Sequence, residues 1–341
     1  MRRVRWAALC AVLLAACTSG HAGRTSPAST ASVAPADAPL PSVGCTAPRV
    51  DAGDAQLTIT SSGAARTYFR HVPPAYDGTT AMPLVLDFHG YAEGADLHRT
   101  TSGLGPFGDA HGFVTLTPQG AGAVALWDTA LGGTDLRFVG DLLDEAERTL
   151  CIDQRRVFAT GYSNGAFLAS SIACQYADRI AAIAPVAGVS DVPGCAPARP
   201  VPVVAFHGTA DPFVAYDGGF GPAVADLPAP DGSGRTLGQL GVASTGNGRP
   251  PVPDIMAKWA ALDGCGSGAP VQQELAPDVS HFTYPCPAGV GVELYRVNGG
   301  GHTWPGSRFT MQIANVVGST TTTIDADTVM WAFFQAHPRL G

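Results

Sequence analysis

The pentapeptide Gly161–Gly165 constrains the fold of this chain more than any other feature, because it matches the pattern Gly-x-Ser-x-Gly. A run rich in β-formers, Val157–Thr160, precedes it, and a run of small apolar residues, Ala166–Ala173, follows it. This order predicts a buried strand, a sharp turn and a buried helix, with the hydroxyl of Ser163 exposed at the turn. Glycine makes up 42 of the 341 residues, so the pattern alone also fits a glycine-rich turn without chemistry. The flanking elements favour a nucleophile elbow.

Short apolar runs alternate with helical patterns along most of the chain. The further strands expected are Leu57–Thr60, Arg66–Val72, Leu84–Phe88, Phe113–Leu116, Ile180–Val186, Val201–Phe206 and Val292–Val297. A helix is expected from Phe138 to Leu150 with Asp135 as its cap, and a final helix near Asp325. The alternation predicts an α/β fold, with a mostly parallel central sheet and helices on both faces. The segment Gly218–Pro253 has no clear period and is long enough to be a functional lid.

The first residues are typical of an export signal. Three arginines within residues 1–5 precede an uncharged apolar run, Trp6–Ala16, which is too short to span a bilayer. The run ends Leu-Ala-Ala before Cys17, which resembles a bacterial lipobox. Ordinary cleavage after Ala16 is the alternative, but Leu14 is large for the position three before such a cut. We therefore expect a signal peptide over residues 1–16 and a lipid anchor on Cys17, with the protein exported to the outer face of the membrane.

Composition separates the rest of the chain into a tether and one domain. Residues 17–44 are rich in Ser, Thr, Ala and Pro and predict a flexible linker, and residues 45–341 predict one catalytic domain. Only 14% of the residues are charged, which excludes disorder for most of the chain. Acidic residues outnumber basic ones, 28 against 20, so a nucleic-acid partner is not expected.

Six cysteines remain once Cys10 and Cys17 are assigned to the leader and the anchor. Proximity in the sequence favours the pairs Cys174–Cys195 and Cys265–Cys286, which leaves Cys45–Cys151. Buried free thiols are the alternative for each pair. An exported protein is the usual place for such disulfides.

A serine nucleophile needs a base and an acid that orients the base. His302 follows three glycines, for which packing offers no reason in the sequence, and Asp211 follows the apolar run that ends at Phe206. The order Ser163, Asp211, His302 is that of a hydrolase triad on an α/β sheet. Two further aspartates, Asp191 and Asp217, compete for the acid role, and His207 is expected to be structural.

Two backbone N–H groups are expected to hold the oxyanion. One is that of Asn164 at the start of the helix, and the other is that of Tyr91 after the early central strand. His89, two residues before Tyr91, is taken as structural. Trp127 and Trp304 are candidates for the substrate pocket, with the core as the alternative place for each.

Five segments in register resemble the polyhydroxybutyrate-depolymerase-like esterase family, which includes feruloyl and acetylxylan esterases and actinobacterial lipoproteins. They are Phe88–Gly90, Thr117–Gly120 with Trp127, Arg156–Gly165, His207–Pro212 and Gly299–Gly306. The resemblance runs from about Leu57 to the final helix, and it implies an α/β-hydrolase fold with Ser163, Asp211 and His302 as the triad. Tyr91 stands where many members have a small residue, and no appended polymer-binding domain is expected, so a crystalline polyester is not the expected substrate.

The sequence thus predicts a lipid-anchored serine esterase acting on small or oligomeric carboxylic esters. No clustered His and Asp ligands and no phosphate loop occur, so no metal or other cofactor is expected. An acyltransferase of the cell envelope, a non-catalytic binding lipoprotein and a serine peptidase remain as alternatives. The acyl group, the alcohol group, protein partners and the oligomeric state stay open.

Overall fold

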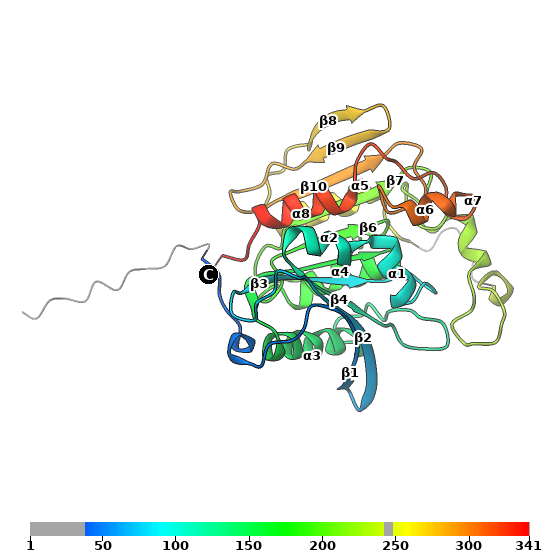
Figure 1. Cartoon of the computed structure of the whole chain (residues 1–341). Helices are drawn as coiled ribbons and strands as arrows, with labels where there is room; N and C mark the ends of the chain where they lie inside the picture. The colour runs from blue at the N-terminus through cyan, green and yellow to red at the C-terminus, as the bar shows by residue number, and fades with distance from the viewer. Residues whose placement is uncertain (1–37, 242–247, 341) are drawn as a thin grey trace, which may run out of the picture. The chain divides into compact units, whose positions relative to one another are not determined.

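The computed structural model describes residues 38–241 and 248–340, in which ten strands form one sheet (Figure 1). The strands lie in the order β1 (Gly53–Ser61), β2 (Ala64–Val72), β4 (Val114–Pro118), β3 (Met82–Phe88), β5 (Ile152–Tyr162), β6 (Ala182–Val186), β7 (Val203–Gly208), β10 (Val292–Val297), β9 (Val279–Thr283) and β8 (Val271–Ala276). The six central strands from β4 to β10 are parallel. The strands at both edges are antiparallel.

Helices cover both faces of the sheet, as the sequence predicts (Figure 1). One face carries α3 (Thr134–Thr149), α4 (Asn164–Gln175) and α5 (Val252–Leu262), and the other carries α2 (Leu104–His111) and α8 (Ala326–Ala336). The shorter α1 (Ala95–Ser102) precedes α2, and α6 (Arg308–Gln312) and α7 (Ala314–Val317) follow β10. Three short 3₁₀ helices cover Val43–Thr46, Pro222–Asp226 and Gly238–Leu240.

The central strands are buried on both sides, and their side chains divide between two cores. In β3, Leu84 and Leu86 belong to the core under α3 and α4, whereas Val85 belongs to the core under α8. In β7, Val203 and Val204 divide in the same way. Alternation of side chains between the two faces explains why these strands read as continuous apolar runs. No helix within the described ranges is both long and apolar enough to cross a membrane.

The folded body begins before the predicted boundary at Cys45. The N–H of Leu40 donates to Asp153 Oδ1 at 2.9 Å, and the N–H of Ser42 donates to the Ile152 carbonyl at 2.9 Å. The Ser42 hydroxyl also donates to the Leu150 carbonyl at 2.6 Å. Residues 38–44, which composition assigned to the tether, are therefore bound to the start of β5. The predicted signal peptide and Cys17 lie outside the described residues.

The predicted cap of the long helix is wrong. The helix α3 begins after Gly133, and Asp135 lies inside its first turn. The Asp135 carboxylate accepts from Arg66 Nη2 at 2.7 Å and from the N–H of Asp128 at 2.7 Å. It thus ties α3 to β2 and to the loop before the helix.

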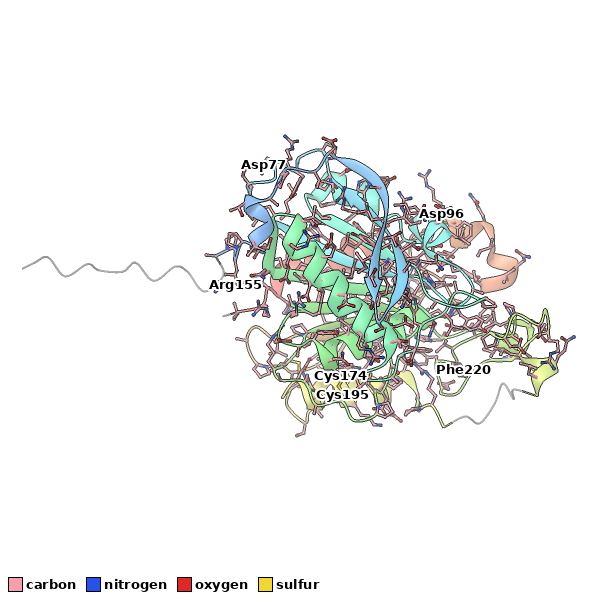
Figure 2. All side chains as sticks on the ribbon, turned by 90° about the horizontal axis from the view of Figure 1, so that it is seen from below. Asp77, Asp96, Arg155, Cys174, Cys195 and Phe220 are labelled. Atoms are coloured by element: carbon pink, nitrogen blue, oxygen red, sulfur yellow. A yellow bond between two sulfur atoms is a disulfide. The ribbon has the colours of Figure 1, made fainter. Side chains whose placement is uncertain are left out.

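Three disulfides join Cys45 to Cys151, Cys174 to Cys195 and Cys265 to Cys286. Two of these are the pairs that proximity in the sequence favoured, and Cys45–Cys151 is the pair that they left. Cys174 lies near the end of α4, and Cys195 is joined to it there, seen from below in Figure 2. The first pair fastens the N-terminal segment to the start of β5, and the other two close shorter loops.

Candidate active site

Ser163 lies on a strained turn between β5 and α4. Its φ is 56° and its ψ is −116°, a left-handed conformation that is rare for a residue with a side chain. The turn is packed against β3, since a Cβ atom built on Gly165 would lie 2.1 Å from the Phe88 carbonyl oxygen. The two elements that meet here leave room only for glycine. Ser163 is thereby held out at the carboxyl end of the central strand.

An acid and a histidine meet beside this turn. Asp211 follows β7 and His302 follows β10, and Asp211 Oδ2 lies 2.7 Å from His302 Nδ1. The other oxygen, Asp211 Oδ1, accepts from the N–H groups of Phe213 at 2.8 Å and Val214 at 2.9 Å. Burial alone would raise the pKa of Asp211, but the facing His302 and these donors hold it below its ordinary value. The carboxylate is therefore ionised and points at one nitrogen of the histidine ring.

The glycines before His302 have a packing reason that the sequence did not reveal. A Cβ atom on Gly301 would lie 2.0 Å from the Val317 carbonyl oxygen, and one on Gly208 would lie 2.2 Å from the Gly300 carbonyl oxygen. The loops after β7 and β10 therefore touch through their backbones. The Tyr162 hydroxyl, next to Ser163, donates to the His302 carbonyl and fixes the loop from the other side.

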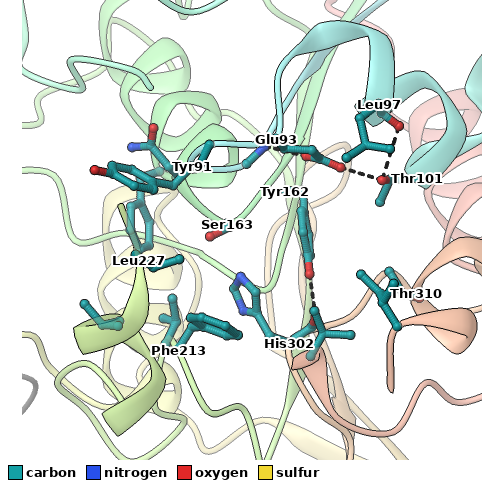
Figure 3. A pocket seen from close by; sticks show the side chains of 18 of the residues that line it. Tyr91, Glu93, Leu97, Thr101, Tyr162, Ser163, Phe213, Leu227, His302 and Thr310 are labelled. Carbon is teal, nitrogen blue, oxygen red and sulfur yellow. Dashed lines mark hydrogen bonds between the residues drawn. The ribbon is translucent and has the colours of Figure 1, made fainter. Parts of the chain in front are cut away.

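Ser163 and His302 border the same cavity, which has a volume of about 450 Å³. Figure 3 shows the His302 ring directed toward the Ser163 side chain. The Ser163 hydroxyl makes no hydrogen bond to a residue of the described ranges. Such contacts are often long in enzymes without substrate and tighten on binding.

Two N–H groups near Ser163 have no acceptor within the part of the chain that the structure describes. They are those of Tyr91, in the turn after β3, and of Asn164, at the first position of α4. The Asn164 side chain is occupied elsewhere, since its Oδ1 accepts from the N–H of Trp127 at 2.7 Å. The Tyr91 ring borders the cavity, and its hydroxyl donates to the Pro228 carbonyl at 2.7 Å.

The cavity is lined mainly by apolar side chains from four regions. They are Leu97 on α1, Phe167 on α4, Phe213, Phe220, Val224, Leu227 and Leu237 between β7 and α5, and Phe309, Ile313 and Val317 after β10. The segment that the sequence marked as a lid thus supplies one wall. Phe220 stands at its start, on the side of the molecule away from Arg155 (Figure 2).

The two tryptophans proposed for the pocket do not line it. Trp304 is 1% exposed, and its indole N–H donates to Asp327 Oδ1 at 2.9 Å under α8. Trp127 is 2% exposed, and its indole N–H donates to the His89 carbonyl at 2.9 Å. Both rings are buried with their polar atom paired, so they support the site from behind.

The other candidate acids and histidines have different partners. Asp191 pairs with Lys258, and Asp217 is exposed. His207 Nε2 lies 2.8 Å from the Val214 carbonyl oxygen, and burial lowers the pKa of His207 to about 4. His89 accepts from the N–H of Gly120, and burial lowers its pKa to about 4 as well. Both rings are therefore neutral near pH 7, and their partners fit the structural role expected from the sequence.

Sequence reasoning missed Glu93, which borders the cavity, and the aromatic side chains of Phe213 and Phe220. Glu93 had a local signal, because it stands three residues after Gly90 in a turn that follows a buried strand. The two phenylalanines had none, since their place depends on how a loop without period folds back.

A serine on a strained strand–helix turn, with an aspartate and a histidine at the same edge of a mostly parallel sheet, defines an α/β hydrolase. The acetyl xylan esterase from Aspergillus awamori has this fold, with a TM-score of 0.54 at 15% identity over 77% of this chain and 98% of its own. No protein-family model matches the chain.

Curated relatives narrow the class to a family. The putative esterase NocK of Nocardia uniformis subsp. tsuyamanensis is 30% identical over an alignment of 298 residues, and the match covers 80% of this chain and 80% of that protein. Feruloyl esterase B of Piromyces equi is 28% identical over 240 residues, and the match spans 67% of this chain but 41% of that protein. The chain belongs to the feruloyl- and acetylxylan-esterase-like family of α/β hydrolases, which makes it a carboxylic-ester hydrolase.

Proposed function

We propose that the chain is an exported serine esterase that cleaves carboxylic esters through an acyl-enzyme on Ser163. Ser163 attacks the ester carbonyl, and His302 takes the hydroxyl proton and passes it to the leaving alcohol. Asp211 holds the histidine tautomer and stabilises the imidazolium. The N–H groups of Tyr91 and Asn164 hold the oxyanion, and water then releases the acid.

One observation carries this proposal. Asp211 contacts His302 at 2.7 Å, and the ring of His302 is directed at Ser163, which stands on a strained elbow (Figure 3). A buried ion pair with only a structural role has no need to face a serine held at a φ of 56°. The strain is maintained by the packing of Gly165 against β3, which is typical of functional sites.

The cavity supports esters with a compact apolar acyl group. Its walls are mainly aliphatic and aromatic, and its volume of about 450 Å³ suits a small molecule or a short oligomer. Feruloyl, acetyl and short hydroxybutyrate esters are the candidates, the first two of which appear in the names of relatives. The Tyr91 ring in the cavity wall should narrow the acyl side further.

A panel of esters tests the proposed activity. Purified protein is incubated with p-nitrophenyl acyl esters, methyl ferulate, acetylated xylan, hydroxybutyrate trimers and a polyhydroxybutyrate film. We expect turnover of the soluble esters and slow or no clearing of the film. Clearing of the film at the rate of trimer hydrolysis would overturn the proposed substrate class.

Ser163→Ala tests the nucleophile. The variant should keep its fold and lose kcat by about 10⁶-fold, the effect of removing a triad serine. Circular dichroism serves as the control for folding. Retained turnover of p-nitrophenyl acetate by the pure variant would sink the mechanism.

The anchor is tested separately, since Cys17 lies outside the described residues. The six paired cysteines fit folding outside the cytosol, and Cys17 would carry the diacylglyceryl group. We expect Cys17→Ser to appear in the soluble fraction or to stay unprocessed. Equal recovery of the wild-type protein and of Cys17→Ser in the membrane fraction would contradict lipidation at this residue.

A further inference from the structure

The turn between β3 and α1, residues 89–94, is closed by a carboxylate of its own. The N–H of Gly90 donates to Glu93 Oε2 at 2.7 Å, and the N–H of Glu93 donates back to the Gly90 carbonyl at 3.3 Å. The N–H of Ala92 donates to the Ala125 carbonyl at 2.8 Å. Between these bonded groups stands the N–H of Tyr91, which has no partner in the described ranges. The Glu93 carboxylate therefore sets the shape of the turn that carries this N–H.

Glu93 is held in place by two side chains of α1. His98 Nδ1 lies 3.0 Å from Glu93 Oε2, and the Thr101 hydroxyl donates to Glu93 Oε1 (Figure 3). The Glu93 side chain is 9% exposed. Because both of its oxygens accept from donors of the protein, the carboxylate is a poor partner for a substrate hydroxyl.

His98 gives this carboxylate a buried counter-charge. Its Nε2 lies 2.7 Å from Asp87 Oδ1, and its side chain is fully buried between Asp87 on β3 and Glu93. Burial would lower the pKa of His98, but the two carboxylates raise it to about 10. In turn burial would raise the pKa of Glu93, but charged His98 holds it below its ordinary value. Glu93 is thus ionised and fixed at neutral pH.

The turn also presses on the elbow. A Cβ atom on Gly90 would lie 3.0 Å from Tyr162 Cδ1 and 3.5 Å from Ser163 Cβ. A shift of the turn therefore changes the position of the Tyr91 N–H relative to Ser163. Displacements of about 1 Å in a donor of this kind can cost about a hundredfold in rate.

Given the proposed function, on which this inference rests, we propose that Glu93 is a positioning residue of the oxyanion hole. It clamps Gly90, is braced by His98 and Asp87, and so directs the N–H of Tyr91 at the oxygen that becomes negative when Ser163 attacks. Its contribution belongs to the transition state, so it should act on kcat more than on KM.

Glu93→Gln is the first test. The amide keeps the size of the side chain but places an NH₂ group among three donors, which disturbs the clamp. We expect kcat for p-nitrophenyl acetate to fall about tenfold to a hundredfold, less than or equal to the loss of a whole oxyanion donor, with KM within about twofold.

A phenylalkyl trifluoromethyl ketone gives a second readout that a general loss of stability would not move. The Ser163 oxygen adds to its carbonyl carbon, the hydroxyl proton passes to His302, and the carbonyl oxygen becomes an oxyanion in the hole. We expect its inhibition constant to rise by the same factor as kcat/KM falls, because it reports on the same N–H groups.

Thr101→Val and Thr101→Ser serve if Glu93→Gln fails to fold. Valine removes one donor to Glu93 at nearly constant volume, and we expect a smaller loss of kcat than in Glu93→Gln, with unchanged KM. Serine keeps the hydroxyl, so kcat of Thr101→Ser should stay near the wild-type value. Asp263→Asn is the matched control. Asp263 is a buried carboxylate that accepts one N–H, that of Val201 at 2.9 Å, away from the cavity, so kcat should stay at the wild-type value.

The outcomes separate this inference from the proposed function. If Ser163→Ala keeps full turnover, the proposed function fails, whatever Glu93→Gln does. If Ser163→Ala is inactive while Glu93→Gln or Thr101→Val keeps wild-type kcat and wild-type affinity for the ketone, only the positioning role fails. Parallel losses of kcat and ketone affinity in the Glu93 variant, with Asp263→Asn unaffected, support it.

Discussion

At the scale of single residues, the site depends on hydrogen bonds that fix the orientation of Asp211 and His302. Asp211 Oδ1 accepts from two backbone N–H groups, and Oδ2 lies 2.7 Å from His302 Nδ1 and 3.5 Å from His207 Nε2. Tyr162 and the backbone of Val317 fix the histidine loop from outside, since the N–H of His302 donates to the Val317 carbonyl at 2.6 Å. The second ring nitrogen of His302 and the Ser163 hydroxyl remain available to a substrate, and both face the cavity.

Asp211→Asn should lower kcat by about 10⁴-fold while the fold persists. The amide still accepts from the backbone, but it presents an NH₂ group or a weaker acceptor to His302 and favours the wrong tautomer. Steady-state kinetics with p-nitrophenyl acetate measure the effect. Asp217→Asn is the control, because Asp217 is exposed and should leave kcat unchanged; a reversed result would assign the acid role to Asp217.

At the scale of elements, the carboxyl ends of β3, β5, β7 and β10 each contribute one part of the site. The sequence predicts these strands because parallel strands buried on both faces are continuous apolar runs. It also predicts Ser163, Asp211 and His302 as candidates, because each follows such a run. Element order and these residues are local properties of the chain, so they can be inferred without coordinates.

Other elements gave no usable pattern. The helix α2 contains two glycines and a proline, and β8 is exposed along most of its length, so neither shows an apolar period. The sequence offers Trp127 and Trp304 as candidates for the pocket or the core, because size and position cannot distinguish a ring that lines a cavity from one that lies behind it. Their indole N–H partners come from segments distant in sequence, which only the fold brings together.

The buried contact between His98 on α1 and Asp87 on β3 predicts a pH-dependent stability. His98 binds a proton in the folded state up to a pKa of about 10, whereas its ordinary value is 6.5. The stabilisation by charged His98 is complete below pH 6.5 and is lost as the pH rises toward 10, because the folded state binds the extra proton in this window. The groups that face His98 are Asp87 and Glu93, with Asp327 and His89 nearby.

Thermal unfolding at pH 7 and pH 9.5 measures this effect. The wild-type midpoint should fall over this interval by more than that of His98→Gln, whose amide does not titrate. The variant will be less stable at pH 7, since two buried carboxylates lose their counter-charge, so the comparison uses the change with pH and not the absolute midpoint. Equal changes in the two proteins would contradict a charged His98.

At the scale of the whole molecule, the three disulfides constrain very different lengths of chain. Cys45–Cys151 spans 106 residues and encloses the strands β1 to β4 and the helix α3, whereas each of the other two spans 21 residues. In the loop-entropy description a longer closed loop restricts the unfolded chain more.

Paired serine substitutions test this difference. Cys45→Ser/Cys151→Ser should cost about 1.4 kcal/mol more unfolding free energy than Cys174→Ser/Cys195→Ser, because that description gives about 4.8 kcal/mol for the long loop and about 3.3 kcal/mol for the short one. Cys265→Ser/Cys286→Ser has the same separation as the second pair and is its matched control. Denaturant titration measures all three, and an equal loss in all variants would contradict the dependence on loop length.

The hydrogen bond from the Tyr91 hydroxyl to the main-chain carbonyl of Pro228 joins the turn of residues 89–94 to the wall of the cavity. A carbonyl acceptor is present whatever side chain stands at that position, so the wall can exchange its residues without breaking this link. Phe220, Val224, Leu227 and Leu237 can therefore vary while the machinery on the sheet stays the same. Evolution toward new acyl groups, natural or directed, can thus change the cavity wall between β7 and α5 while the catalytic residues at the sheet stay the same.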